Sequence, residues 1–310
     1  MVRYICAQPA NNYYTWQVET LIHNFLKHGI NGNHMDILLS YQGEVDDVWR
    51  KLQREYPYIR FFFYPDTRQD TKYIPGIYFN LMKQHLKAHP ELENEVLFTH
   101  DSDIVFTRPV DWSHLTEDDT WYLSDTNSYI NYEYIMQKGE YILDGMCDIV
   151  GIDKDTVKEN NLHSGGAQYI VKNTHHEMWD KIESDSYKLY NYFLEIEPEW
   201  VKNNKKGAYP IQKWTAGMWS YLWNGWYYGH KTEVHPSLNF GWVTNKYDDV
   251  LENSILHNSG VLNGNNGLFY KGQYVDTLPY GQDLDIDKEK ASYYYYQQVQ
   301  EAGKKSCLLK

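Results

Sequence analysis

An alternation of short apolar runs with amphipathic stretches, covering the first 110 residues, restricts the fold more than any other feature of the sequence. The runs RYICAQ, HMDILLSY, IRFFFY and EVLFTH are typical of strands, and the stretches between them have apolar residues at helical spacing. Strands that alternate with helices predict an α/β fold: a Rossmann-like, mostly parallel central sheet flanked by helices. Ligands bind such sheets beyond the carboxyl ends of the strands.

The alternation weakens after about residue 120. We expect helices over 174–194 and 211–228, and short strands with Gly- and Asn-rich loops over 233–275, which gives a mixed C-terminal portion. Residues 281–310 are charged and then rich in tyrosine, and predict a peripheral C-terminal helix and tail. We therefore expect one domain over 1–280, with halves at 1–110 and 111–280.

Composition excludes several classes of protein. The net charge of −13 argues against a protein that coats nucleic acid through a large basic surface. No run approaches the ~20 apolar residues of a membrane span, and the three cysteines are too few and scattered for a disulfide framework or a zinc cluster. These features predict a soluble protein of a reducing compartment. The 30 tyrosines and 11 tryptophans have two interpretations: an aromatic core, or rings that line a groove for sugars or bases.

The segment FTHDSDIVF sets two carboxylates, Asp101 and Asp103, at the carboxyl end of the fourth strand. Three other D-x-D tripeptides begin at Asp153, Asp283 and Asp285, and their polar surroundings are typical of solvated turns or helix starts. Carboxylates buried at a strand end need a cation or hydrogen-bond donors nearby. Oxygen ligands of this kind suit Mn²⁺ or Mg²⁺. The alternative is an ordinary acidic turn capped by Arg108.

VLFTHDSDIVFTRP resembles the metal-binding D-x-D turn of GT-A fold glycosyltransferases, which transfer sugars from nucleotide diphosphates. The resemblance implies that Asp103 binds the metal, that Asp101 contacts the metal or the ribose, and that Ser102 lies in the donor site. It also implies that residues 1–110 are the nucleotide-binding half and 111–280 the half for the sugar and acceptor.

Two later segments strengthen this resemblance. NLHSGGAQYIVKN resembles the S-G-G element that lines the sugar and acceptor pocket, and a plain hairpin turn is the alternative. The residues concerned are His163, Ser164, Gly165 and Gly166. ILHNSGV resembles the C-terminal H-x-x-G element, which implies His257 as a metal ligand and Gly260 beside the diphosphate. Lys271 is then a candidate cation for the departing diphosphate, with solvent exposure as the alternative.

At a finer level the chain resembles the hydroxyproline O-arabinosyltransferase-like group, through NNYYTWQVE and KWTAGMWSYLW. That group implies a glutamate before the methionine of the second segment, and this chain has Gly217 there. Relatives in the group are membrane-anchored and secretory, whereas no such segment is present here, so we expect a cytoplasmic protein of a bacterium or a virus-infected cell.

Four further residues are candidates with open alternatives. Gln8 and Tyr14 suit contact with the uracil or ribose, or a capping or packing role. Arg68 suits the sugar or phosphate, or an ion pair with Asp66 or Asp70. Among the tryptophans of 214–226 we expect several in the core, with Trp214 as the candidate platform for a sugar or acceptor.

The sequence therefore predicts a metal-dependent glycosyltransferase that moves a sugar, with a pentose such as arabinose as one option, from a UDP-type donor to an acceptor hydroxyl. Residues 205–232 hold no Asp or Glu for an inverting base, which favours retention, although Asp125, Glu195, Glu197 or Glu199 remain alternatives. The acceptor stays open between a protein hydroxyl, a glycan and the hydroxymethyl group of a modified phage DNA base. A non-catalytic carbohydrate- or nucleotide-binding protein is the second hypothesis, and a divalent-metal phosphohydrolase the third.

Overall fold

The computed structural model describes residues 1–261 and 266–309. The fold is α/β, with a mostly parallel central sheet flanked by helices, as the alternation predicts. The chain forms two compact units. Unit 1 comprises Met1–Pro65, Leu97–Thr116 and Pro236–Lys310, and unit 2 comprises Asp66–Val96 and Glu117–His235. Within the described residues, no helix combines the length and the apolar character needed to cross a bilayer.

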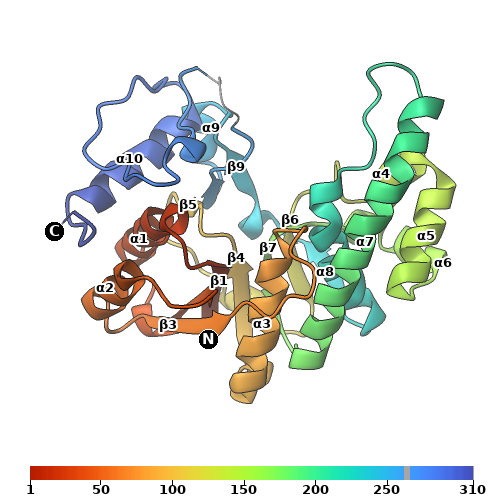
Figure 1. Ribbon diagram of the computed structural model, residues 1–310, viewed down its shortest axis with the longest axis horizontal. Helices are drawn as coiled ribbons and strands as arrows, with labels where there is room; N and C mark the ends of the chain where they lie inside the picture. The colour runs from red at the N-terminus through yellow and green to blue at the C-terminus, as the bar shows by residue number, and fades with distance from the viewer. Residues whose placement is uncertain (262–265, 310) are drawn as a thin grey trace. The chain divides into compact units, whose positions relative to one another are not determined.

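Unit 1 begins with the predicted strand–helix units (Figure 1). Its strands lie in the order β3-β2-β1-β4, with bounds β1 Val2–Pro9, β2 Met35–Tyr41, β3 Arg60–Pro65 and β4 Val96–His100. β1 pairs with β2, and β2 with β3, in parallel. Helices α1 (Asn12–Lys27) and α2 (Asp47–Glu55) connect the first three strands. Six of the seven residues of β2 are buried, among them Asp36, which pairs with Arg60 of β3.

A second, mixed sheet in unit 1 has the order β5-β10-β9. Its strands are short: β5 Ile104–Phe106, β9 Phe240–Trp242 and β10 Ile255–His257. Helices α9 (Tyr247–Val250) and α10 (Ala291–Gly303) pack together, and α10 also lies along α1 (Figure 1). Trp16 of α1, Val105 of β5 and Tyr295 of α10 belong to one buried cluster. The C-terminal helix therefore contributes to the core of unit 1.

Unit 2 holds three strands and most of the remaining helices. β7 (Gly166–Val171) pairs antiparallel with β6 (Trp121–Ser124), which pairs in parallel with β8 (Thr232–Val234). The long helix α7 (His176–Asn203) packs against both α3 (Gly76–Ala88) and α8 (Ala216–Tyr227), as Figure 1 shows in orange and green. The two helices predicted after residue 120 are thus present, and α7 extends nine residues beyond the expected end at 194.

Three shorter helices in unit 2 were not predicted. They are α4 (Tyr132–Lys138), α5 (Glu140–Val150) and α6 (Lys154–Glu159). Gly139, with a φ of 144°, separates α4 from α5, and Gly151, with a φ of 78°, ends α5 before α6. α4 and α6, with seven and six residues, carry too few turns for helical periodicity to stand out, whereas the buried residues of α5 do recur at helical spacing.

Candidate metal centre

The D-x-D turn joins the two sheets of unit 1. β4 ends at His100 and β5 begins at Ile104, so Asp101, Ser102 and Asp103 form the turn between two buried strands. The Asp103 side chain is 7% exposed, whereas that of Asp101 is 55% exposed. The pair therefore has one carboxylate inside the protein and one at its surface.

Strand pairing brings His257 to this turn, although it is far away in the sequence. β10 runs antiparallel to β5 with His257 opposite Ile104, the residue that follows Asp103. The Asn258 amide donates to the Asp103 carbonyl at 2.9 Å, and at the other end Thr107 N donates to the Ser254 carbonyl at 3.0 Å. These bonds fix the register, and a slip by one residue would turn the imidazole to the other face of the sheet.

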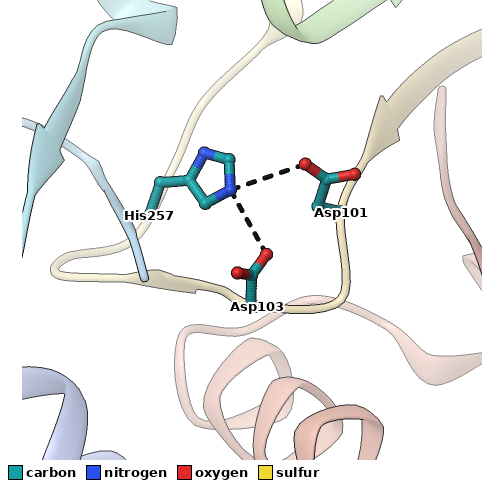
Figure 2. Close-up of side chains that lie close together, drawn as sticks. All are labelled: Asp101, Asp103 and His257. Carbon is teal, nitrogen blue, oxygen red and sulfur yellow. Dashed lines mark ion pairs between the residues drawn. The ribbon is translucent and has the colours of Figure 1, made fainter. Parts of the chain in front are cut away.

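The three side chains converge on one point (Figure 2). His257 Nε2 lies 3.4 Å from Asp101 Oδ2 and 3.2 Å from Asp103 Oδ1. One ligand atom from each residue falls within 4.8 Å of the others. Two carboxylate oxygens and one imidazole nitrogen are a donor set that fits Mn²⁺. The same set fits Mg²⁺ when the carboxylate oxygens are its main ligands. The arrangement can therefore hold a divalent cation and leave positions for ligand oxygens.

Lys271 adds a positive charge to the same cluster. Its Nζ forms an ion pair with Asp103 Oδ2, while His257 contacts the other oxygen of that carboxylate. Burial raises the pKa of Asp103, but Lys271 and His257 outweigh this effect and hold the pKa well below its usual range. Burial lowers the pKa of His257, but the charge and hydrogen bond of Asp103 together with the charge of Asp101 outweigh this effect, so that the pKa is raised. Asp103 is therefore ionised under all ordinary conditions.

Packing on both sides fixes the backbone that carries Lys271. Phe269 N donates to Ser292 Oγ at 2.7 Å, and the carbonyl of Tyr274 accepts from Trp16 Nε1 at 3.1 Å. The rings of Phe269 and Tyr274 stack with centroids 5.5 Å apart. Both rings are buried, so the lysine projects from an anchored turn, with its side chain 29% exposed.

Other residues near the cluster come from the start of α1 and from the H-x-x-G segment. Burial raises the pKa of Tyr14 to about 12, and the charges of Lys271 and Asp103 act on both Tyr13 and Tyr14. Ser259 Oγ is buried and has no hydrogen-bond partner among the described residues. Sequence reasoning missed Tyr13 and Ser259, although both stand next to residues that it selected.

The remaining donor candidates of unit 1 lie in two different environments. Gln8 is 3% exposed near the end of β1 and donates from Nε2 to the Leu38 carbonyl at 3.2 Å. Gly260 has a φ of +79°, and a methyl group there would meet no atom of the described residues within 4 Å. A glycine at this position therefore suits the backbone conformation.

The alternative of an acidic turn capped by Arg108 is wrong. Arg108 Nε donates to Ser254 Oγ at 3.1 Å, and Nη2 donates to the Glu252 carbonyl at 2.9 Å. The carboxylates have His257 and Lys271 as their partners instead. The aspartates of the other three D-x-D tripeptides are exposed, as their polar context predicts.

Arg68, in unit 2, forms the ion pair with Asp66 that its alternative interpretation expects. Nε donates to Asp66 Oδ1 at 2.9 Å and Nη2 to Oδ2 at 2.8 Å. The Arg68 side chain is 9% exposed, and Nη1 also reaches the Ile74 carbonyl at 3.3 Å. The guanidinium thus ties the loop before α3 together.

The S-G-G element begins β7, and its glycines are required by packing. A methyl group on Gly165 would lie 2.4 Å from the Ser124 carbonyl oxygen, and one on Gly166 would lie 2.7 Å from the Tyr169 hydroxyl. Ser164 is buried and donates to the Asn160 carbonyl at 3.1 Å, while His163 is exposed. The glycines therefore allow close approach within unit 2.

The tryptophans of the α8 region divide into buried and exposed residues, as expected. Trp219 and Trp223 are 0% exposed and Trp226 is 6% exposed, whereas Trp214 is 56% exposed. Trp214 lies in the single turn Lys213–Thr215 before α8, and its ring centroid is 6.1 Å from that of Tyr129. Trp214 is thus an indole presented to solvent beside a second ring.

Gly217 occupies a position with no room for a side chain. A methyl group there would lie 2.7 Å from Phe79 Cε2 and 2.8 Å from the Tyr73 hydroxyl. That hydroxyl accepts from Gly217 N at 2.7 Å and donates to the Trp214 carbonyl at 2.8 Å. Aromatic packing in unit 2 therefore excludes the glutamate implied by the arabinosyltransferase-like resemblance.

Comparison with known proteins returns similar structures without similar sequences. No family model matches the chain, and no curated protein matches it. The bifunctional glycosyltransferase WbbM is similar with a TM-score of 0.47 and 8% identity over 99% of this chain, which spans 50% of the WbbM chain. The galactosyltransferase LgtC, solved with donor and acceptor sugar analogues, is similar with a TM-score of 0.40 and 12% identity. The match covers 98% of this chain and 96% of LgtC. Mouse xyloside xylosyltransferase 1 is similar with a TM-score of 0.41 and 11% identity. The match covers 84% of this chain and 98% of the xylosyltransferase chain.

Proposed function

We propose that this protein is a metal-dependent glycosyltransferase that moves a sugar from a UDP-type donor to an acceptor hydroxyl. The observation that carries the proposal is the convergence of Asp101, Asp103 and His257 at the carboxyl end of β4, with Lys271 on the same carboxylate. Acidic and imidazole ligands beside a cation match the needs of a diphosphate leaving group. Asp101, Asp103, His257 and Lys271 all belong to unit 1.

Each residue of the cluster has a distinct role in this proposal. Asp103 and His257 hold Mn²⁺ or Mg²⁺, and the half-exposed Asp101 completes the site or contacts the ribose. When bound, the metal supplies charge neutralisation for the diphosphate as the bond to the sugar breaks. Lys271 offers a second positive charge to the phosphate oxygens, and Ser259 and the Gly260 backbone are the proposed neighbours of the same diphosphate. Tyr14 and Gln8 are the proposed contacts of the nucleoside.

We favour retention of the anomeric configuration. An inverting enzyme needs a base opposite the leaving group, and residues 205–232 hold neither Asp nor Glu. The tight packing at Gly217 supports this preference, because no carboxylate fits there. Glu197 is already paired with Lys213, whereas Asp125 accepts from the Asn127 amide at 3.0 Å and is exposed. NMR of the product anomer tests the assignment, and an inverted product would contradict it.

For the acceptor, we propose a platform in unit 2. Trp214 and Tyr129 offer ring faces that suit the apolar face of a sugar, and the S-G-G residues 163–166 are the proposed acceptor-side neighbours. A glycan, a protein hydroxyl and a hydroxymethylated DNA base remain the candidate acceptors. A DNA acceptor would need basic residues such as Lys202, Lys205, Lys206 and Lys213 at the groove. Of these, Lys213 is paired with Glu197.

One observation favours a second candidate function, a non-catalytic carbohydrate- or nucleotide-binding protein. The implied glutamate is replaced by Gly217 and cannot be accommodated there. A screen of nucleotide sugars with Mn²⁺, with mass spectrometry of candidate acceptors, separates the two functions. Binding of a UDP-sugar without transfer or hydrolysis from any donor would favour the non-catalytic protein.

The central test is the Asp103→Asn variant. It keeps the size of the side chain and removes the charge that both His257 and Lys271 contact, so Mn²⁺-dependent UDP release should fall at least ~100-fold. Asp285→Asn is the matched control, because it changes an exposed D-x-D aspartate of the same unit. Activity retained by Asp103→Asn would remove the assignment of this cluster as the catalytic centre.

A further inference from the structure

The Asp103 carboxylate has two partners of different kinds. His257 Nε2 lies 3.2 Å from Oδ1, and the Lys271 ammonium pairs with Oδ2. The Asp103 side chain is 7% exposed, so this ion pair lies mostly out of water. A buried carboxylate without a cation is strongly disfavoured. Lys271 therefore supplies a positive charge that stabilises the buried Asp103 carboxylate, which Figure 2 shows with His257 and Asp101, when no metal is bound.

A divalent ion on Asp103 would compete with this ammonium. Both need the same carboxylate oxygens, and two cations in one small, buried site repel each other. The turn that carries Lys271 is anchored through Phe269 and Tyr274, so its backbone has little freedom to withdraw. The flexible four-carbon side chain, 29% exposed, is the part that can move.

We propose that Lys271 is the internal counterion of Asp103, that a divalent metal displaces it from this carboxylate, and that its ammonium then transfers to the donor's diphosphate. The inference rests on the proposed function, since it assumes a metal and a diphosphate at this cluster. The lysine must leave Asp103 before the metal binds fully, and a diphosphate gives it a new partner. Metal and diphosphate should therefore bind cooperatively, and each should strengthen the other to the same extent.

This coupling differs from a simple contact between Lys271 and phosphate. If the lysine only contacted the diphosphate, its removal would weaken nucleotide binding and leave the affinity for metal alone unchanged. If it also neutralises Asp103, its removal strengthens the binding of metal alone, because the competitor is gone. The sign of the change in metal affinity without nucleotide separates the two roles.

The test measures Mn²⁺ binding by electron paramagnetic resonance of the free aqua ion, with and without UDP or inorganic pyrophosphate. In the wild type, UDP and pyrophosphate should each tighten Mn²⁺ binding about tenfold or more. In Lys271→Met, Mn²⁺ alone should bind about tenfold more tightly than in the wild type, and both anions should have a much smaller effect. Lys271→Arg keeps the charge and should keep most of the coupling. Circular dichroism checks that each variant is folded.

Lys27→Met is the matched control. Lys27 pairs with Glu301 on the surface of the same unit, with both side chains 49% exposed, so the variant loses the same charge away from the site. Unchanged Mn²⁺ affinity in Lys271→Met, in a folded protein that binds Mn²⁺ through Asp103, would overturn the inference and leave the proposed function standing. Absence of Mn²⁺ binding in the wild type, with or without UDP, would overturn both.

Discussion

Gly217 lies in the first turn of α8, where the Tyr73 hydroxyl and the Phe79 ring occupy the space that a β-carbon would need. The Tyr73 hydroxyl joins the start of α8 to the turn of Trp214 by two hydrogen bonds. One glycine thus allows the aromatic packing that holds the exposed indole in place. At the scale of single residues, the departure from the arabinosyltransferase-like pattern is a packing requirement of unit 2.

Substitution of Gly217 should therefore destabilise the protein. Gly217→Ala gains helix propensity, but its methyl group would overlap Phe79 and Tyr73, so we expect a net loss of about 1–3 kcal/mol in the free energy of unfolding. Phe79→Leu removes the ring atoms that clash and should recover part of this loss in the double variant. Urea denaturation measures all three variants. An alanine variant as stable as the wild type would show that the rings move aside at little cost.

The two classes of tryptophan should respond differently to truncation. Trp219 is fully buried, so Trp219→Ala should cost about 3–5 kcal/mol in unfolding free energy. Trp214 is 56% exposed, and its backbone contact with Tyr73 survives truncation, so Trp214→Ala should change stability by less than about 0.5 kcal/mol. The same urea experiment measures both. A large loss in Trp214→Ala would assign the indole to packing and remove the reason to propose it as a platform.

At the scale of elements, strand pairing assembles the metal centre and helix α1 connects it to the C-terminal tail. The sequence predicted β1 to β4 and the D-x-D position because apolar strands with amphipathic helices leave a local pattern. It also placed His257 and Lys271 in the site, through motifs. The ion pair between Lys271 and Asp103 was beyond prediction, since it joins residues 168 positions apart and depends on the packing that anchors the turn of Lys271.

Glu19 on α1 also makes contacts with residues far away in the sequence, which no local pattern predicts. Its carboxylate is 0% exposed. Oε1 accepts from the Tyr56 hydroxyl at 3.2 Å and the Cys307 amide at 3.0 Å. Oε2 accepts from the Tyr280 hydroxyl at 2.9 Å and the Ser306 hydroxyl at 2.6 Å. The three bonds from Tyr280, Ser306 and Cys307 attach the C-terminal segment to α1, the helix that also anchors the turn of Lys271 through Trp16.

Glu19→Gln should release the tail. The amide nitrogen would face groups that donate hydrogen bonds, which leaves at least one donor unsatisfied and costs about 1–3 kcal/mol. Burial raises the pKa of the Cys307 thiol to about 12, so in the wild type it should react slowly with a thiol reagent at pH 8. In Glu19→Gln, labelling of Cys307 should be about tenfold faster by peptide mass spectrometry.

Two comparisons control the labelling experiment. Cys6 and Cys147 are buried elsewhere, and their rates should stay unchanged within the same sample. Glu301→Gln alters a surface carboxylate of α10, with the side chain 49% exposed, and should leave Cys307 protected. Equal protection of Cys307 in Glu19→Gln and the wild type would mean that other contacts hold the tail.

At the scale of the whole molecule, the metal centre belongs to one unit, built from separate chain segments. Asp101 and Asp103 come from Leu97–Thr116, whereas His257 and Lys271 come from Pro236–Lys310. The unfolded chain does not hold these side chains together, so a ligand that needs all of them binds only folded unit 1. Mn²⁺ with UDP at about 100 times the dissociation constant should then stabilise it by about 2.7 kcal/mol.

This stabilisation should appear as a rise of about 5–10 °C in the Tm of the unit 1 transition, measured by calorimetry at fixed protein concentration. Asp103→Asn should lose the rise, because the carboxylate shared by His257 and Lys271 no longer carries a charge. Asp285→Asn should keep it, since that residue is exposed and outside the cluster. An equal rise in both variants would place the binding of Mn²⁺ and UDP elsewhere, because only a site that needs Asp103 can distinguish them.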